Sequence, residues 1–100
     1  MSWMDALMSV LMFIRDPEDR VYLASTINYL LQEYEQGHLS EEELRANIIG
    51  ELKDVIALNA PELSEDEVLE KARQIADEII RRYRVKRSFR RLRSRLGGRM

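Results

Sequence analysis

Apolar residues recur every three or four positions through three long stretches of the chain, and this spacing constrains the fold more than any other feature. Side chains three or four residues apart lie on one face of an α-helix, whereas a strand requires strict alternation. The three apolar stripes are Leu23, Ile27, Leu30, Leu31 and Tyr34; Leu44, Ile48, Leu52, Val55 and Ile56; and Val68, Ala72, Ile75, Ile79 and Tyr83. The sequence therefore predicts an all-α protein with these stripes in its core.

Capping residues predict where each helix begins and ends. The start signals are Ser2 with Asp5, Asp16 before Pro17, Ser40 with Glu43, and Ser64 with Glu67. A side-chain oxygen at such a position accepts a hydrogen bond from a first-turn N–H group that lacks a partner within the helix. The stop signals are Gly37, Asn59-Ala60-Pro61 and Gly97-Gly98. We expect a bundle over residues 1–83 with helices at 2–14, 17–36, 41–58 and 65–83, the last able to extend to 96, and a basic amphipathic tail over 84–100.

The composition suits one small domain. Hydrophobic residues make up 45% of the 100 residues and charged residues 34%, which lies on the globular side of the boundary with disorder. The chain has no cysteine, which excludes disulfides, thiolate zinc sites and thiol nucleophiles. This fits a reducing compartment, and we expect a cytoplasmic protein.

The first expected helix is apolar almost all round, because only Asp5 and Ser9 interrupt it. It is too short to span a bilayer, which requires about 20 apolar residues, so we expect no integral membrane segment. The other helices can wrap it, a second chain can cover it, or it can lie on a membrane surface. Methionines every four residues favour a homo-oligomer or a larger complex, because methionine adapts to irregular partners. The predicted interface is Trp3, Met4, Leu7, Met8, Leu11 and Met12.

Charge is segregated along the chain. Residues 1–80 hold 18 acidic and six basic side chains, a net charge of −12, whereas residues 81–100 hold ten basic residues and no acidic one. The ten are Arg81, Arg82, Arg84, Lys86, Arg87, Arg90, Arg91, Arg93, Arg95 and Arg99. Nine are arginines, whose planar guanidinium groups match phosphate and carboxylate groups and stack on bases.

Interactions within the folded chain can explain why some of these basic residues are present. Cations near a helix C-terminus complement its dipole, and Asp77–Arg81 and Glu78–Arg82 are favourable pairs four residues apart, but these effects reach only the nearest residues. Alternatively, the tail folds back on acidic faces of this chain or of a neighbour, which are rich in Glu33, Glu35, Glu41 and Glu42.

The tail also has an apolar ridge, formed by Val85, Phe89, Leu92 and Leu96. Each residue advances about 100° around a helix axis, and we take Ile79 as zero. The ridge then lies at roughly 220° to 280° around the axis, whereas the core stripe of the preceding helix lies between about −40° and +60°. A straight helix cannot direct both at one core. We therefore expect either a kink near Arg84 or a tail that projects past the bundle.

No catalytic, metal-binding or nucleotide-binding motif is recognisable. His38 is the only histidine and follows a turn glycine, so we expect it on the solvated surface. The run Glu41-Glu42-Glu43 diverges by about 100° per residue around a helix, and capping explains it sufficiently. A helix-turn-helix interpretation fails because Ser64-Glu65-Asp66-Glu67 would set acids against DNA. We expect a non-enzymatic protein without cofactor or metal.

The favoured hypothesis is a nucleic-acid-binding protein or accessory subunit that contacts RNA or DNA through the ten basic residues. Tyr83 and Phe89 are candidates for stacking on single-stranded bases. The alternative is a structural or adaptor protein that oligomerises through its first helix and docks its basic tail on an acidic protein partner. Basic amphipathic helices also bind anionic membranes.

Overall fold

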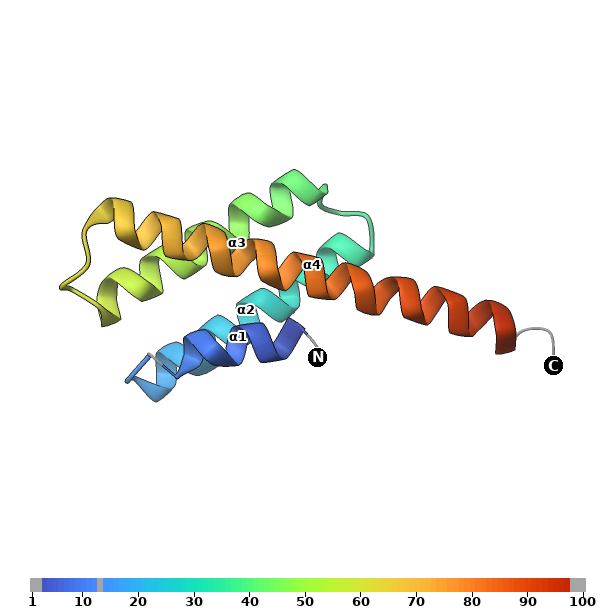
Figure 1. Ribbon diagram of the computed structural model, residues 1–100, viewed down its shortest axis with the longest axis horizontal. Helices are drawn as coiled ribbons and strands as arrows, with labels where there is room; N and C mark the ends of the chain where they lie inside the picture. Colours follow the sequence, from blue (N-terminus) through green and yellow to red (C-terminus); the bar gives the residue numbers. More distant parts are fainter. Residues whose placement is uncertain (1–2, 13, 98–100) are drawn as a thin grey trace.

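The computed structural model describes the backbone of residues 3–12 and 14–97 and the side chains of residues 3–12 and 14–84. Within these ranges the chain forms four helices and no strand: α1 (Trp3–Leu11), α2 (Pro17–Glu35), α3 (Glu41–Asn59) and α4 (Glu65–Gly97). Successive helices run in opposite directions (Figure 1). The prediction of a small all-α bundle is confirmed.

The predicted capping boxes form at the starts of α3 and α4. The Ser40 hydroxyl accepts the Glu43 N–H at 3.1 Å, and the Glu43 carboxylate accepts the Ser40 N–H at 3.0 Å. Ser64 and Glu67 make the same two hydrogen bonds at 3.2 and 3.0 Å. The carboxylate of Asp16 caps α2. These local hydrogen bonds satisfy backbone groups at the helix ends and fix where each helix begins.

Gly37 ends α2 in a left-handed conformation, with φ of 84°. Its N–H donates to the Tyr34 carbonyl at 3.1 Å, and the N–H of His38 donates to the Glu33 carbonyl at 2.9 Å. This pair of hydrogen bonds forms a Schellman motif, which commonly requires glycine at the left-handed position. The turn directs the chain from α2 back along α3.

The long helix α4 lies between α1 and α3, and α2 packs against α3 (Figure 1). The buried core residues are Trp3, Ala6, Leu7, Val10, Ile14, Leu23, Ile27, Leu30, Leu31, Leu44, Ile48, Leu52, Val55, Ile56, Val68, Ala72, Ala76, Ile79, Ile80 and Tyr83. All five predicted stripe residues of α3 belong to this core. Tyr34 and Ile75 of the other two stripes are partly buried, and Ala76 and Ile80 widen the buried face of α4.

The structure divides α1 into a buried face and an exposed face. Trp3 and Leu7 are 6% and 0% exposed in the core of their own chain. Met4, Met8 and Met12 are 43%, 52% and 81% exposed. Leu11 is partly buried against the core. The bundle itself therefore covers Trp3 and Leu7. Of the six predicted interface residues, only Met4, Met8 and Met12 are exposed and available to a second chain.

The end of α1 differs from the sequence-based expectation. The helix stops at Leu11 rather than at residue 14, and Ile14 is buried in the connection to α2. Arg20 of α2 donates to the Ile14 carbonyl at 2.5 Å, which gives that carbonyl a partner outside a helix. The predicted cap Ser2 lies outside the described residues. A membrane crossing would require a longer apolar stretch than any helix in the described ranges contains.

Candidate nucleic-acid interface

Two of the predicted binding residues, Arg81 and Arg82, bind the same carboxylate within α4. Arg81 Nη2 and Arg82 Nε each lie 2.6 Å from Oε1 of Glu78. These hydrogen bonds lower the pKa of Glu78 to about 2, because they stabilise its ionised form. The predicted Glu78–Arg82 pair therefore forms, whereas Asp77 does not bind Arg81 as predicted but binds Arg45 of α3.

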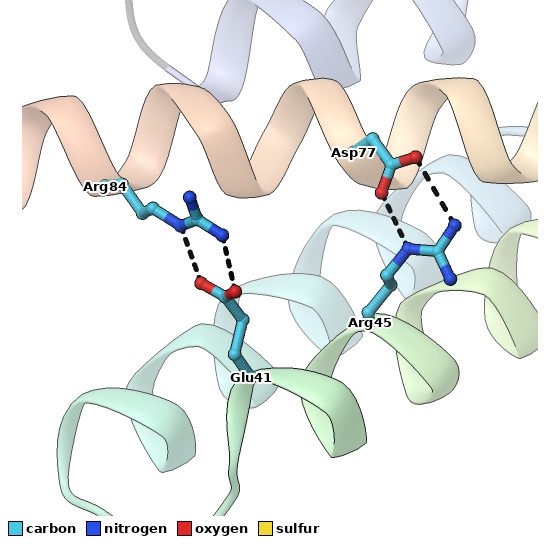
Figure 2. A network of polar contacts seen from close by, with 4 residues as sticks. All are labelled: Glu41, Arg45, Asp77 and Arg84. Carbon is cyan, nitrogen blue, oxygen red and sulfur yellow. Dashed lines mark hydrogen bonds and ion pairs between the residues drawn. The ribbon is translucent and has the colours of Figure 1, made fainter.

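Two ion pairs of opposite polarity join α3 to α4 (Figure 2). Arg45 of α3 donates through Nε to Asp77 Oδ1 at 2.7 Å and through Nη2 to Oδ2 at 3.4 Å. Arg84 of α4 donates to both carboxylate oxygens of Glu41, with Nε 2.6 Å from Oε1. Each helix supplies one arginine and one acid, so a shift of α4 along α3 would break both pairs. These exposed pairs fix the alignment of the two helices more than they stabilise the fold.

Tyr83, predicted as a candidate for base stacking, lies in the core. The residue is 7% exposed. Its ring meets the ring of Tyr34 edge-on at 6.4 Å between centroids, and its hydroxyl donates to Glu35 at 2.5 Å. The protein's own α2 therefore occupies the surroundings of this ring, and a base cannot stack on it while α4 is packed. Its role is to anchor α4 against α2.

Beyond Arg84, the backbone of α4 continues as helix and extends past the other three helices (Figure 1). We name residues 85–97 the basic segment. Its sequence holds six of the predicted binding residues, Lys86, Arg87, Arg90, Arg91, Arg93 and Arg95, together with Phe89 and no acid. A helix of this length is about 20 Å long. The side chains of these seven residues and the whole of Arg99 lie outside the described part of the chain.

Away from the contact between α3 and α4, the described surface has a pocket beside α1 but no cluster of metal-binding side chains. A pocket of about 360 Å³ lies between α1, the end of α3 and α4, and is lined by apolar residues such as Val10 and Ile56 and by charged ones such as Glu62 and Lys71. No group of three or more His, Asp or Glu side chains that could hold a metal ion occurs among the described residues. The His38 side chain is 63% exposed and contacts Glu33, in agreement with its predicted surface position.

Comparison with known proteins assigns neither a family nor a function. No protein-family model matches the chain, and no curated protein or solved structure matches it.

Proposed function

We propose that the protein binds RNA or DNA through the basic segment and does not catalyse a reaction on it. The observation that supports this proposal is the division of nine of the ten basic residues, all except Arg99, between two settings. Arg81, Arg82 and Arg84 bind Glu78 and Glu41 of their own chain. Six others follow on a helix that projects beyond the bundle (Figure 1). This projection presents positive charge along one continuous, regularly spaced scaffold.

Phosphate neutralisation would supply most of the affinity. Each phosphate contact releases condensed counterions, so log K falls with log[salt] with a slope of about −0.9 per contact on duplex DNA and about −0.7 on a single strand. Six contacts give a slope of about −5 on a duplex and about −4 on a single strand. Raising the salt from about 50 to 200 mM then weakens duplex binding by about 10³-fold.

A matched pair of variants tests whether this binding belongs to the basic segment or to charge in general. Both variants lose three positive charges, so they have the same net charge. The segment variant carries Arg90→Gln, Arg91→Gln and Arg93→Gln, and the body variant carries Arg15→Gln, Lys53→Gln and Arg73→Gln at exposed positions. Binding to fluorescent oligonucleotides of mixed sequence, single- and double-stranded, is followed by anisotropy over a salt series.

We expect the segment variant to reduce the magnitude of the duplex salt slope by about 2.7, because three contacts are lost. The body variant should keep the slope of the unaltered protein. Equal slopes for the two variants, or no binding by the unaltered protein at low salt, would refute the proposal.

A second candidate function is supported by three methionines, of which Met4 and Met8 lie on α1 and Met12 directly follows it. Met4, Met8 and Met12 recur every four residues and are all exposed, and a row of exposed apolar side chains on one helix face is typical of a protein interface. In this case the protein is a structural subunit that self-associates through α1. Met8→Lys should then reduce the sedimentation mass to that of one chain, whereas an unchanged mass would exclude this interface.

A further inference from the structure

A row of exposed apolar side chains lies where α2 meets α3, outside the stripes that form the core. Tyr22 and Tyr29 of α2 are 52% and 58% exposed, and Leu58 of α3 is 76% exposed. Seven residues separate the tyrosines, so they share one helix face and lie about 10 Å apart along α2. The Tyr22 hydroxyl donates to Glu51 of α3 at 2.9 Å, and Leu58 follows Glu51 by the same seven residues. Both helices therefore contribute to one row.

The charged side chains that the structure places against the two tyrosines are acidic. Glu51 and Asp54 neighbour Tyr22, and the Tyr29 hydroxyl donates to Glu33 at 2.7 Å. The hydrogen bonds to Glu51 and Glu33 raise the pKa of Tyr22 and Tyr29, because an adjacent carboxylate disfavours the phenolate. We name Tyr22, Tyr29, Leu58, Glu33, Glu51 and Asp54 the acidic–aromatic strip. It combines apolar contact area with negative charge.

We propose that the acidic–aromatic strip binds the basic segment of a second copy of this chain. The sequence spaces Val85, Phe89, Leu92 and Leu96 four, three and four residues apart, which predicts an apolar ridge about 16 Å long among basic residues. Basic amphipathic helices bind protein surfaces that offer apolar contacts and acidic neighbours. Guanidinium groups also bind the faces of exposed tyrosine rings.

Charge complementarity favours this partner. Residues 1–84 hold 18 acidic and nine basic residues, a net charge of −9, and the basic segment carries +6, so the body of one copy attracts the basic segment of another. Two basic segments packed ridge against ridge would instead bring six positive charges against six, with no acid between residues 85 and 97 to compensate. The strip is therefore a better partner for the ridge than a second ridge.

The geometry of α4 excludes the strip of the same chain. Residues 65–97 form one helix, and its C-terminal part extends past the other three helices (Figure 1). This helix binds α3 through Arg45 and Glu41 (Figure 2). At about 100° per residue, Arg45 and Glu41 lie about 120° and about 80° around α3 from Glu51 of the strip, both on the same side. The basic segment cannot reach its own strip while α4 remains helical, so a basic segment on the strip comes from another copy.

A complementation experiment with full-length chains tests this inference in the absence of nucleic acid. The strip variant carries Tyr22→Ala, Tyr29→Ala and Leu58→Ala, all at exposed positions. The ridge variant carries Phe89→Ala and Leu92→Ala. Sedimentation equilibrium at low salt should give the unaltered protein a mass that rises with concentration above the 11.8 kDa of one chain, and each variant alone should stay at 11.8 kDa. An equimolar mixture should form a complex of one chain of each variant, because it restores one intact strip and one intact ridge.

Several results would overturn the inference. The unaltered protein could be monomeric at every concentration, or the equimolar mixture of the two variants could stay monomeric. The strip variant could also associate as the unaltered protein does, while Met8→Lys in α1 abolishes association. Asp54→Lys keeps all the apolar side chains and should raise the dissociation constant at low salt, so an unchanged constant would also count against it. The inference does not rest on nucleic-acid binding, because the sedimentation experiment contains no nucleic acid and its outcome is read separately from the anisotropy measurements.

Discussion

Leu7 and Met8 are neighbours on α1, yet the structure gives them opposite environments. Leu7 is 0% exposed in the core and Met8 is 52% exposed. Leu7→Ala removes three buried carbons, which costs about 2.4 kcal/mol at about 0.8 kcal/mol each. The cavity that remains adds to this, so we expect a total loss of about 3–5 kcal/mol. Met8→Ala should change the free energy of unfolding by less than about 0.5 kcal/mol, because both residues favour helix and the site is half solvated.

Urea unfolding followed by tryptophan fluorescence measures both substitutions. Trp3 is the only tryptophan and is 6% exposed in the same core, so its emission reports on the packing of α1. With a slope of about 1–3 kcal/mol per molar urea, a loss of about 3 kcal/mol lowers the midpoint by about 1–3 M. The effect of Leu7→Ala should be the same at all protein concentrations, because the contact lies within one chain.

Two results would refute this reasoning. Equal midpoints for Leu7→Ala and Met8→Ala would show that the bundle does not bury Leu7. A Leu7→Ala effect that grows with protein concentration would show that a second chain covers this face instead.

The remaining predictions concern two glycines and one carboxylate. Gly37→Ala should lower the free energy of unfolding by about 1–2 kcal/mol, because φ at this position is +84°. Gly50→Ala should raise it by about 0.5–1 kcal/mol, because a Cβ added inside α3 meets nothing within 4 Å. Urea unfolding measures both changes, and two changes of the same sign would contradict the structure. The depressed pKa of Glu78 means that its ion pairs stabilise the fold above the ordinary value of 4.5 and that this stabilisation is lost as the pH falls toward 2. Glu78→Gln should therefore lower Tm near neutral pH by an amount that shrinks below pH 4.5, and a difference that does not vary with pH would exclude this account.

The helix positions were predictable because their signals are local. A capping box requires only Ser40 and Glu43 or an equivalent pair, and the end of α2 requires only a glycine that tolerates positive φ. The bounds of α2 and α3 agree with the predicted ranges to within one residue at each end. The end of α1 was less predictable, because a nearly continuous apolar run contains no stop signal before Asp16.

The candidate site was predictable only in part. The concentration of basic residues after residue 80 is visible in the sequence, but the apolar spacing that placed Tyr83 on the core stripe could not show which residues cover its ring. Tyr34 and Glu35 of α2 do so. The acidic–aromatic strip was missed because its residues come from two helices. Its available signal was the pair Tyr22 and Tyr29, which are seven residues apart and outside the apolar stripe of α2.

By itself, the sequence determined where the helices lie, which of their residues are apolar, and how charge divides between body and tail. Only the tertiary structure decided which face of α1 is buried and which arginines already have acidic partners. Arg84 and Glu41 are 43 residues apart, and Arg45 and Asp77 are 32 apart. Interactions within a helix involve residues three or four positions apart, whereas contacts between helices depend on how all four apolar faces share one core.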